Sequence, residues 1–98
     1  MQVNVVGRHF DVTDAIDAYA TKKTGNLDRY SDKVQQVETL IEKEKVEFKV
    51  EIVVAVAGHA DIVARGHHED LYACIDLVSD KAVRQLTDWN AKLKDHRG

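Results

Sequence analysis

The strongest constraint on the fold is an apolar repeat in the last third of the chain. Between positions 70 and 95, apolar side chains recur at spacings of three and four residues, the period of an amphipathic α-helix. The members of this stripe are Leu71, Ile75, Val78, Ala82, Leu86, Trp89 and Leu93. Such a stripe has to be buried against another layer, so the pattern predicts a long helix packed on the rest of the protein.

The polar side of this predicted helix sorts its charges. At about 100° per residue, Lys81, Arg84 and Lys92 fall within an arc of roughly 80° on one flank of the stripe. Asp76 and Asp80 fall on the other side. The helix therefore offers one cationic edge to a partner.

The preceding residues alternate in the manner of strands. Alternation of apolar and polar side chains predicts strands at residues 2–7, 34–43, 49–57 and 60–65. Residues 66–68 are predicted to be a loop that leads into the long helix, and the connection at residues 44–47 contains no Gly or Pro to mark its limits.

A first helix is predicted between the first two strands. Thr13 is its expected N-cap, and Asp14 and Asp17 lie in its first turn, where the helix dipole favours acids. Its expected inner face consists of Ile16, Tyr19, Ala20, Lys23, Leu27 and Tyr30. The order β-α-β-β-β-α predicts an α+β two-layer sandwich, in which two helices cover one face of a four-stranded sheet.

Composition limits the class of protein. A chain of 98 residues predicts a single domain, 1–98. The net charge of −3 argues against a simple basic nucleic-acid binder. The lone Cys74 excludes an internal disulfide and fits a reducing compartment. Without a signal peptide or an apolar run of about 20 residues, the chain is expected to be cytoplasmic and to have no membrane partner.

The cationic flanks are the main candidate for function. Lys22 and Arg29 lie on one flank of the first predicted helix, as Lys81, Arg84 and Lys92 do on the second. Lysine and arginine neutralise phosphates without a sequence code, which favours nucleic-acid binding.

The alternative is a solvated helix edge with local ion pairs. Asp80 with Arg84 and Asp88 with Lys92 have the spacing of four residues that such pairs need on a helix. Charge alone leaves both interpretations open.

Two other groups of residues could carry chemistry. His67, His68, Glu69 and Asp70 have ligand atoms for a metal, but adjacent histidines in a loop do not converge, so no physiological metal site is expected. Cys74 could be a nucleophile beside these histidines, but no third orienting group accompanies it, and a buried thiol is the preferred interpretation.

Two aromatic side chains could stack on bases. Trp89 falls in the middle of the apolar stripe, which favours packing, whereas Tyr72 flanks the stripe and fits either role.

The chain resembles the bacterial ribosome hibernation-promoting factor and ribosome-associated inhibitor family, whose members are also called sigma-factor modulation proteins. The similarity runs from Met1 to about Lys94, and the helical run near its end is the most specific part. The residues that carry it are Met1-Gln2-Val3-Asn4 with Gly7, Thr13-Asp14-Ala15-Ile16, Leu27 with Tyr30, Glu42-Lys43, Asp70-Leu71-Tyr72-Ala73 with Ile75-Asp76, Asp80-Lys81 with Arg84-Gln85-Leu86, and Lys92-Leu93-Lys94.

The resemblance implies a fold similar to double-stranded RNA-binding domains and binding to the small ribosomal subunit, in the channel that holds messenger RNA and transfer RNAs. It implies contacts to ribosomal RNA from basic residues of both helices. The matching positions are Lys22, Lys23, Arg29, Lys81, Arg84, Lys92 and Lys94. No catalytic residue, cofactor, metal or small-molecule substrate is expected.

The chain also departs from the family. Asp17, Asn26, Asp88 and Asn90 stand where members are often basic, which predicts weaker or more salt-sensitive binding. The sequence ends at Gly98 without the C-terminal domain with which long members pair ribosomes, so pairing is expected to need a separate auxiliary factor. The alternative function is a protein-binding modulator of a transcription sigma factor.

Overall fold

The protein is a two-layer α+β sandwich with the predicted element order. The computed structural model describes residues 1–95, apart from the side chains of residues 94 and 95. The elements are β1 (Gln2–Arg8), α1 (Asp14–Thr24), the 3-10 helix η1 (Leu27–Arg29), β2 (Val34–Glu44), β3 (Glu47–Val56), β4 (Ile62–His68) and α2 (Leu71–Asp95). Within this part of the chain, no helix combines the length and the apolar character needed to cross a membrane.

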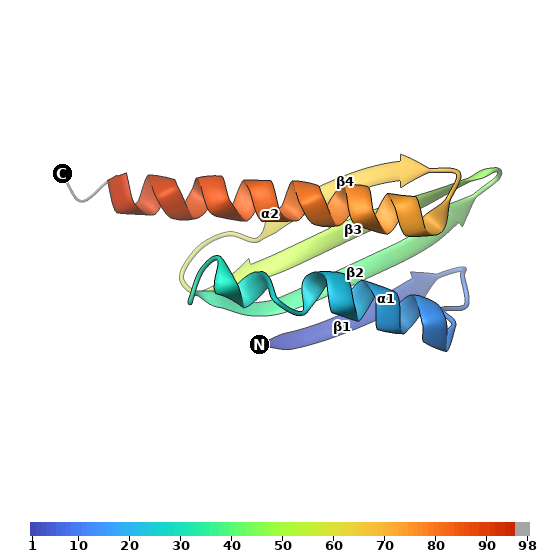
Figure 1. The fold of residues 1–98 in the computed structure, drawn as a ribbon, viewed down its shortest axis with the longest axis horizontal. Coiled ribbons are helices and arrows are strands. Elements are labelled where there is room, and N and C mark those ends of the chain that lie inside the picture. The colour runs from blue at the N-terminus through green and yellow to red at the C-terminus, as the bar shows by residue number, and fades with distance from the viewer. Residues whose placement is uncertain (96–98) are drawn as a thin grey trace.

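The four strands form one mixed sheet in the order β1-β2-β3-β4. β1 runs parallel to β2, and the other two pairs are antiparallel. Both helices cover the same face of this sheet (Figure 1). α2 lies along β3 and β4, whereas α1 lies beside it near β1.

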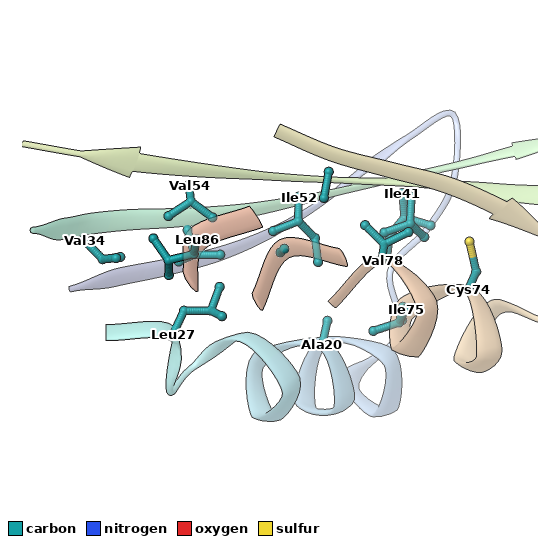
Figure 2. Close-up of a cluster of buried hydrophobic side chains, with 14 of the residues drawn as sticks. Ala20, Leu27, Val34, Ile41, Ile52, Val54, Cys74, Ile75, Val78 and Leu86 are labelled. Carbon is teal, nitrogen blue, oxygen red and sulfur yellow. The ribbon is translucent and has the colours of Figure 1, made fainter. Parts of the chain in front are cut away.

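The core lies between the sheet and the helices and combines both predicted periodicities. Val50, Ile52 and Val54 alternate along β3 and are fully buried, as the strand pattern predicts. From α2, Ile75, Val78 and Leu86 pack into the same cluster (Figure 2). Ala82 is buried there as well. Trp89 at the far end of the stripe is only half-buried.

The first helix is shorter than its apolar pattern predicts. α1 begins at the predicted N-cap, where Thr13 Oγ1 accepts a hydrogen bond from the Ile16 N–H, but it ends at Thr24 with Gly25 as its C-cap. The chain then re-forms a single 3-10 turn that buries Leu27. The prediction that Lys23 lies on the inner face is wrong: Thr24 is fully buried instead, and its hydroxyl donates to the Ala20 carbonyl.

The prediction of a loop at residues 66–68 is also wrong, because β4 continues to His68. Gly66 is a packing residue within this strand. A Cβ atom at Gly66 would come within 2.9 Å of Val78 Cγ2 and 3.4 Å of Leu77 Cδ2 of α2. The missing side chain allows α2 to approach β4 closely.

The connection between β2 and β3 is a tight hairpin. Only Lys45 and Val46 separate the two strands, and Lys45 adopts a φ of 49°. Two-residue hairpins favour residues with positive φ, usually Gly or Asn. Lysine carries no such signal, which explains why the sequence did not define this turn.

One buried hydroxyl leads to a stability prediction. Thr39 is fully buried on β2, and its Oγ1 has no hydrogen-bond partner within residues 1–95. Replacing it in Thr39→Val removes an unsatisfied polar group, so the free energy of unfolding should rise by about 1 kcal/mol. Urea denaturation of both proteins measures this difference.

The control is Thr24→Val. Thr24 is equally buried, but its hydroxyl is bonded to the Ala20 carbonyl at 2.9 Å, so this substitution should give no gain in stability. A less stable Thr39→Val protein would contradict the prediction.

Candidate nucleic-acid interface

The helices carry most of the cations that were predicted to contact RNA. Lys22 and Lys23 occupy the last turn of α1, where positive charge is favoured by the helix dipole. Arg29 lies on η1, and the remaining positions lie on α2. Lys94 is within α2, but its side chain lies outside the described part.

Four of these cations are exposed and free of ion pairs. Within the described residues, none of these side chains takes part in a salt bridge: Lys22, Arg29, Arg84 and Lys92. The local pairs between Asp80 and Arg84 and between Asp88 and Lys92, which the helical spacing allowed, are not formed. These cations are therefore available to an anionic partner.

Lys81 is partly committed to the fold. Its Nζ donates a hydrogen bond to the Arg65 carbonyl of β4 at 2.9 Å, and the side chain is half-buried. β4 is an edge strand, and such strands expose unpaired backbone groups that other chains can pair with. This hydrogen bond joins α2 to the edge strand of the sheet.

Asp76 joins the two helices on the other flank of α2. Its Oδ1 accepts a hydrogen bond from Tyr19 Oη at 2.5 Å and lies 3.2 Å from Lys23 Nζ. Tyr19 also packs edge-on against Tyr72, with ring centroids 4.9 Å apart. Of the predicted RNA-binding side chains that the structure describes, Lys23 is the one held in an ion pair.

The seam between α1 and α2, which we define by Tyr19, Lys23 and Asp76, alters the proton affinity of all three groups. The pKa of Asp76 lies below its ordinary value because Tyr19 donates to the carboxylate and Lys23 lies beside it. The hydrogen bond to Asp76 raises the pKa of Tyr19, with a smaller contribution from burial. Interaction with Asp76 also raises the pKa of Lys23, so this lysine stays charged.

The acidic and the basic flank of α2 face different neighbours. Asp76 contacts α1, whereas Lys81 contacts β4. The five-residue step between them turns about 140° around the helix. α2 therefore turns its basic flank towards β4 and the solvent, while Lys23 meets an acid between the helices.

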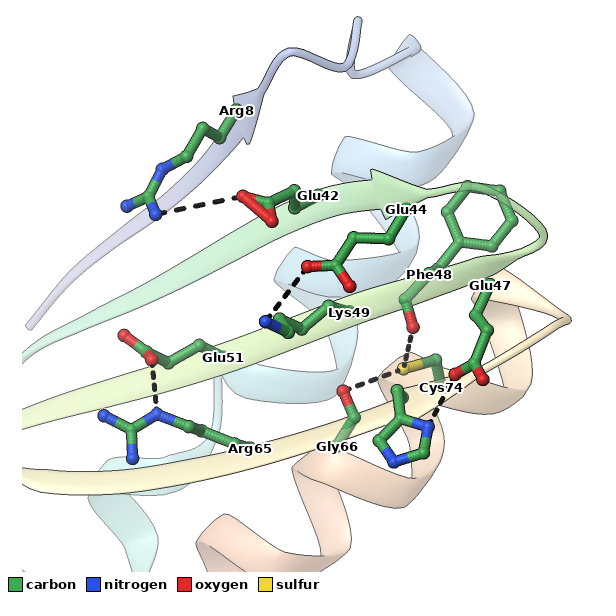
Figure 3. Close-up of polar contacts among 11 residues, drawn as sticks. Arg8, Glu42, Glu44, Glu47, Phe48, Lys49, Glu51, Arg65, Gly66 and Cys74 are labelled. Carbon is green, nitrogen blue, oxygen red and sulfur yellow. Dashed lines mark hydrogen bonds and ion pairs between the residues drawn. The ribbon is translucent and has the colours of Figure 1, made fainter.

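The open face of the sheet has a different electrostatic character. Its cations pair with glutamates on neighbouring strands or along the same hairpin (Figure 3). Arg65 Nε lies 2.6 Å from Glu51 Oε2, and Lys49 Nζ lies 3.1 Å from Glu44 Oε1. Arg8, at 3.9 Å from Glu42, makes a longer contact. An incoming phosphate would have to compete with these carboxylates.

His67 and His68 both lie on β4, and their rings point in different directions. His67 Nδ1 lies 2.6 Å from Glu47 Oε2 on the open face of the sheet, whereas His68 Nδ1 accepts the Asp70 N–H at the start of α2. No group of three metal-binding side chains occurs in the part of the chain that the structure describes. Successive strand residues face opposite sides, so these two imidazoles do not converge.

Cys74 is buried, as predicted. Its Sγ lies 3.7 Å from the Phe48 carbonyl and 3.6 Å from the Gly66 carbonyl, and burial raises the pKa of the thiol (Figure 3). His67, on the opposite side of the sheet, is paired with Glu47 rather than with this sulfur. A thiol with a raised pKa and no adjacent base is a weak nucleophile.

The two aromatic candidates differ in exposure. Trp89 packs against the core and contacts the His59 ring edge-on, with centroids 5.1 Å apart, which fits the packing role. Tyr72 is exposed on α2 and contacts Tyr19 at the seam. Its ring contributes to the contact between the helices.

Residues 3–94 match the family described as Sigma 54 modulation protein / S30EA ribosomal protein. The chain belongs to this family. The resemblance inferred from the sequence is thereby confirmed.

Relatives within the Sigma 54 modulation protein / S30EA family match over most of their length. The chain is 44% identical over 86 residues to the ribosome hibernation promoting factor of Azotobacter vinelandii, covering 88% of this chain and 79% of that protein. It is 36% identical over 96 residues to the ribosome hibernation promoting factor of Escherichia coli K12, covering 98% and 100%.

Solved structures have the same fold. A ribosomal subunit interface protein from Coxiella burnetii superposes with a TM-score of 0.81 at 24% identity, covering 93% of this chain and 99% of that one. The N-terminal domain of Thermus thermophilus Protein Y gives a TM-score of 0.80 at 30% identity, covering 91% and 99%. The predicted two-layer fold is confirmed.

Sequence reasoning missed the role of Asp76. The i,i+4 spacing of Tyr19 and Lys23 put both on one side of the first helix, which is how they reach a common partner. That partner is more than fifty positions away on α2, and no local pattern in the sequence links the two segments.

The seam predicts a dependence of stability on pH. A carboxyl whose pKa is lower in the folded state stabilises the protein above its unfolded-state pKa. The contribution is lost as the pH falls through the folded-state pKa. In Asp76→Asn, the stability deficit relative to the wild type should be constant above about pH 5 and should shrink in more acidic solution.

Urea denaturation between neutral and acidic pH measures this deficit. Asp80→Asn is the matched control, because Asp80 lies one turn along α2 and makes no hydrogen bond or ion pair within the described residues. A deficit for Asp76→Asn that does not shrink at acidic pH would contradict the role given to its charge.

Proposed function

We propose that this protein is a ribosome hibernation factor: a non-catalytic cytoplasmic protein that binds the small ribosomal subunit and occupies its channel for messenger RNA and transfer RNA. Membership in the Sigma 54 modulation protein / S30EA family supports a ribosomal role. The observation that carries the proposal is the set of exposed cations without ion pairs on the helices: Lys22, Arg29, Arg84 and Lys92.

The charges favour the helical side of the protein as the RNA-binding side. Contacts between phosphates and lysine or arginine release condensed counterions, which drives association even when the net charge is negative. On the open face of the sheet, Arg65 and Lys49 are already paired with Glu51 and Glu44. Ribosomal RNA would therefore meet less competition at α1 and α2.

A protein held in this way would inhibit translation by competition. Messenger RNA and transfer RNA are polyanions that use the same RNA-lined channel. The bound domain would exclude them sterically. Its lysine and arginine side chains would also cover phosphates of the channel. No covalent step is required, and the effect would be reversible because the contacts are electrostatic.

The exposed apolar side chains give less support to a protein partner such as a sigma factor. Val6 lies on β1 and Val46 at the tip of the β2–β3 hairpin. Tyr72 and Leu77 are both on α2, but Tyr72 contacts α1 whereas Leu77 lies near Gly66 of β4. Apolar side chains scattered singly are ordinary surface features.

The first test is binding to purified small subunits at several salt concentrations. The wild type should co-sediment at low salt, and log affinity should fall linearly with log salt. Arg84→Gln with Lys92→Gln should weaken binding and reduce the slope by about one for each residue replaced. Both side chains are exposed, so the fold should be retained.

The charge-matched control is Lys33→Gln with Lys45→Gln. Both lysines are exposed outside the helices, and neither forms an ion pair within the described residues. This control should bind nearly as the wild type does. Equal losses in the two double variants would argue for a nonspecific charge effect, and binding that is independent of salt would refute the proposed interface.

The second test concerns occupancy of the channel. Transfer RNA binding to small subunits programmed with messenger RNA should fall as the protein is titrated to saturation, and excess transfer RNA should restore it. A filter-binding assay measures both effects. Unimpaired transfer RNA binding at saturation would exclude the channel.

A further inference from the structure

Lys23 lies in an environment that differs from those of the other cations on the helices. Its Nζ is 3.2 Å from Asp76 Oδ1 and 5.7 Å from the centroid of the Tyr19 ring. The same carboxylate oxygen accepts the Tyr19 hydroxyl at 2.5 Å. Asp76 is therefore fixed at the seam by a second contact, independent of Lys23.

The pair is accessible from solution. The side chains of Lys23 and Asp76 are 40% and 44% exposed. Exposed ion pairs contribute little to stability and are screened by salt, so the lysine can exchange partners. An RNA phosphate could reach Lys23, but it would do so beside a carboxylate that repels it.

From this geometry we infer that Asp76 limits the affinity of the protein for RNA: it holds Lys23 in the free protein and competes with phosphate for this lysine. The inference rests on the proposed binding to ribosomal RNA. Asp76 then has two opposing effects: it stabilises the contact between α1 and α2, and it weakens the complex with ribosomal RNA.

The opposing effects separate this role from a purely structural one. If Asp76 only positioned the helices, its removal would leave RNA binding unchanged or weaken it. If Asp76 competes for Lys23, removal of its charge should strengthen binding although the protein becomes less stable.

The experiment measures binding to purified small ribosomal subunits over a range of potassium chloride concentrations. Asp76→Asn is compared with Asp80→Asn, which changes the net charge equally; the Asp80 carboxylate also acts on Lys23, but from beyond 4 Å, so its removal should have the smaller effect. Asp76→Asn should bind several-fold more tightly than Asp80→Asn at low salt. Its slope of log affinity against log salt should be steeper by about 0.7–0.9, the value of one further phosphate contact.

A double-mutant cycle tests whether Lys23 is the cation that the Asp76→Asn substitution makes available to RNA. Lys23→Gln should cause a small loss of affinity in the wild-type background and a larger loss in the Asp76→Asn background. Equal losses in the two backgrounds would overturn the inference.

Tyr19→Phe controls for loosening of the seam. It removes the hydrogen bond to Asp76 but keeps the carboxylate and its charge, so stability should fall and RNA affinity should not rise. Circular dichroism at the assay temperature verifies that each variant is folded. If Tyr19→Phe gained affinity as Asp76→Asn does, helix separation and not charge would be responsible, and the inference would be wrong.

The two proposals fail in different ways. If the wild type binds small subunits but Asp76→Asn is no tighter than Asp80→Asn, the role of Asp76 is refuted and the proposed function stands. If the wild type does not bind at low salt, the proposed function is refuted, and the inference falls with it.

Discussion

The contact between Val78 of α2 and Gly66 of β4 determines how closely the long helix approaches the sheet. A Cβ atom at Gly66 would meet Val78 Cγ2 at 2.9 Å, so a larger residue would require Val78 or the helix to shift. Because α2 lies this close to the sheet, Lys81 reaches the Arg65 carbonyl. Cys74 Sγ likewise contacts the carbonyls of Phe48 and Gly66. The rotation of α2 about its own axis is fixed by its buried stripe, which includes Ile75, Val78 and Leu86.

That rotation decides how the charges of the helix are distributed. With Val78 and Ile75 directed into the core, Asp76 is turned towards α1 and Lys81 towards the edge of the sheet. Arg84 and Lys92 remain exposed without carboxylate partners closer than 4 Å in the described part of the chain. A chain with a net charge of −3 can thereby present free cations on one side, while the cations of the opposite side are paired.

The seam between the helices shows how stability and binding can conflict. Asp76 gains a hydrogen bond from Tyr19 and an ion pair with Lys23, and both contacts hold α1 against α2. The same ion pair occupies a lysine of the proposed RNA-binding set. An exposed ion pair contributes little to the free energy of folding. It can still compete with an RNA phosphate for Lys23.

Periodicity was sufficient to predict the element order, the two-layer fold and the apolar core of β3 and α2, because the alternation of Val50, Ile52 and Val54 and the repeat of Ile75, Val78 and Leu86 have unambiguous periods. It failed where backbone conformation departs from residue preference, as in the hairpin at Lys45, or where a glycine serves packing, as at Gly66. Which cations are free depends instead on the tertiary structure. Periodicity assigns a residue to a face of its own helix, whereas an ion pair such as Lys23 with Asp76 depends on how two distant helices are placed by the core between them.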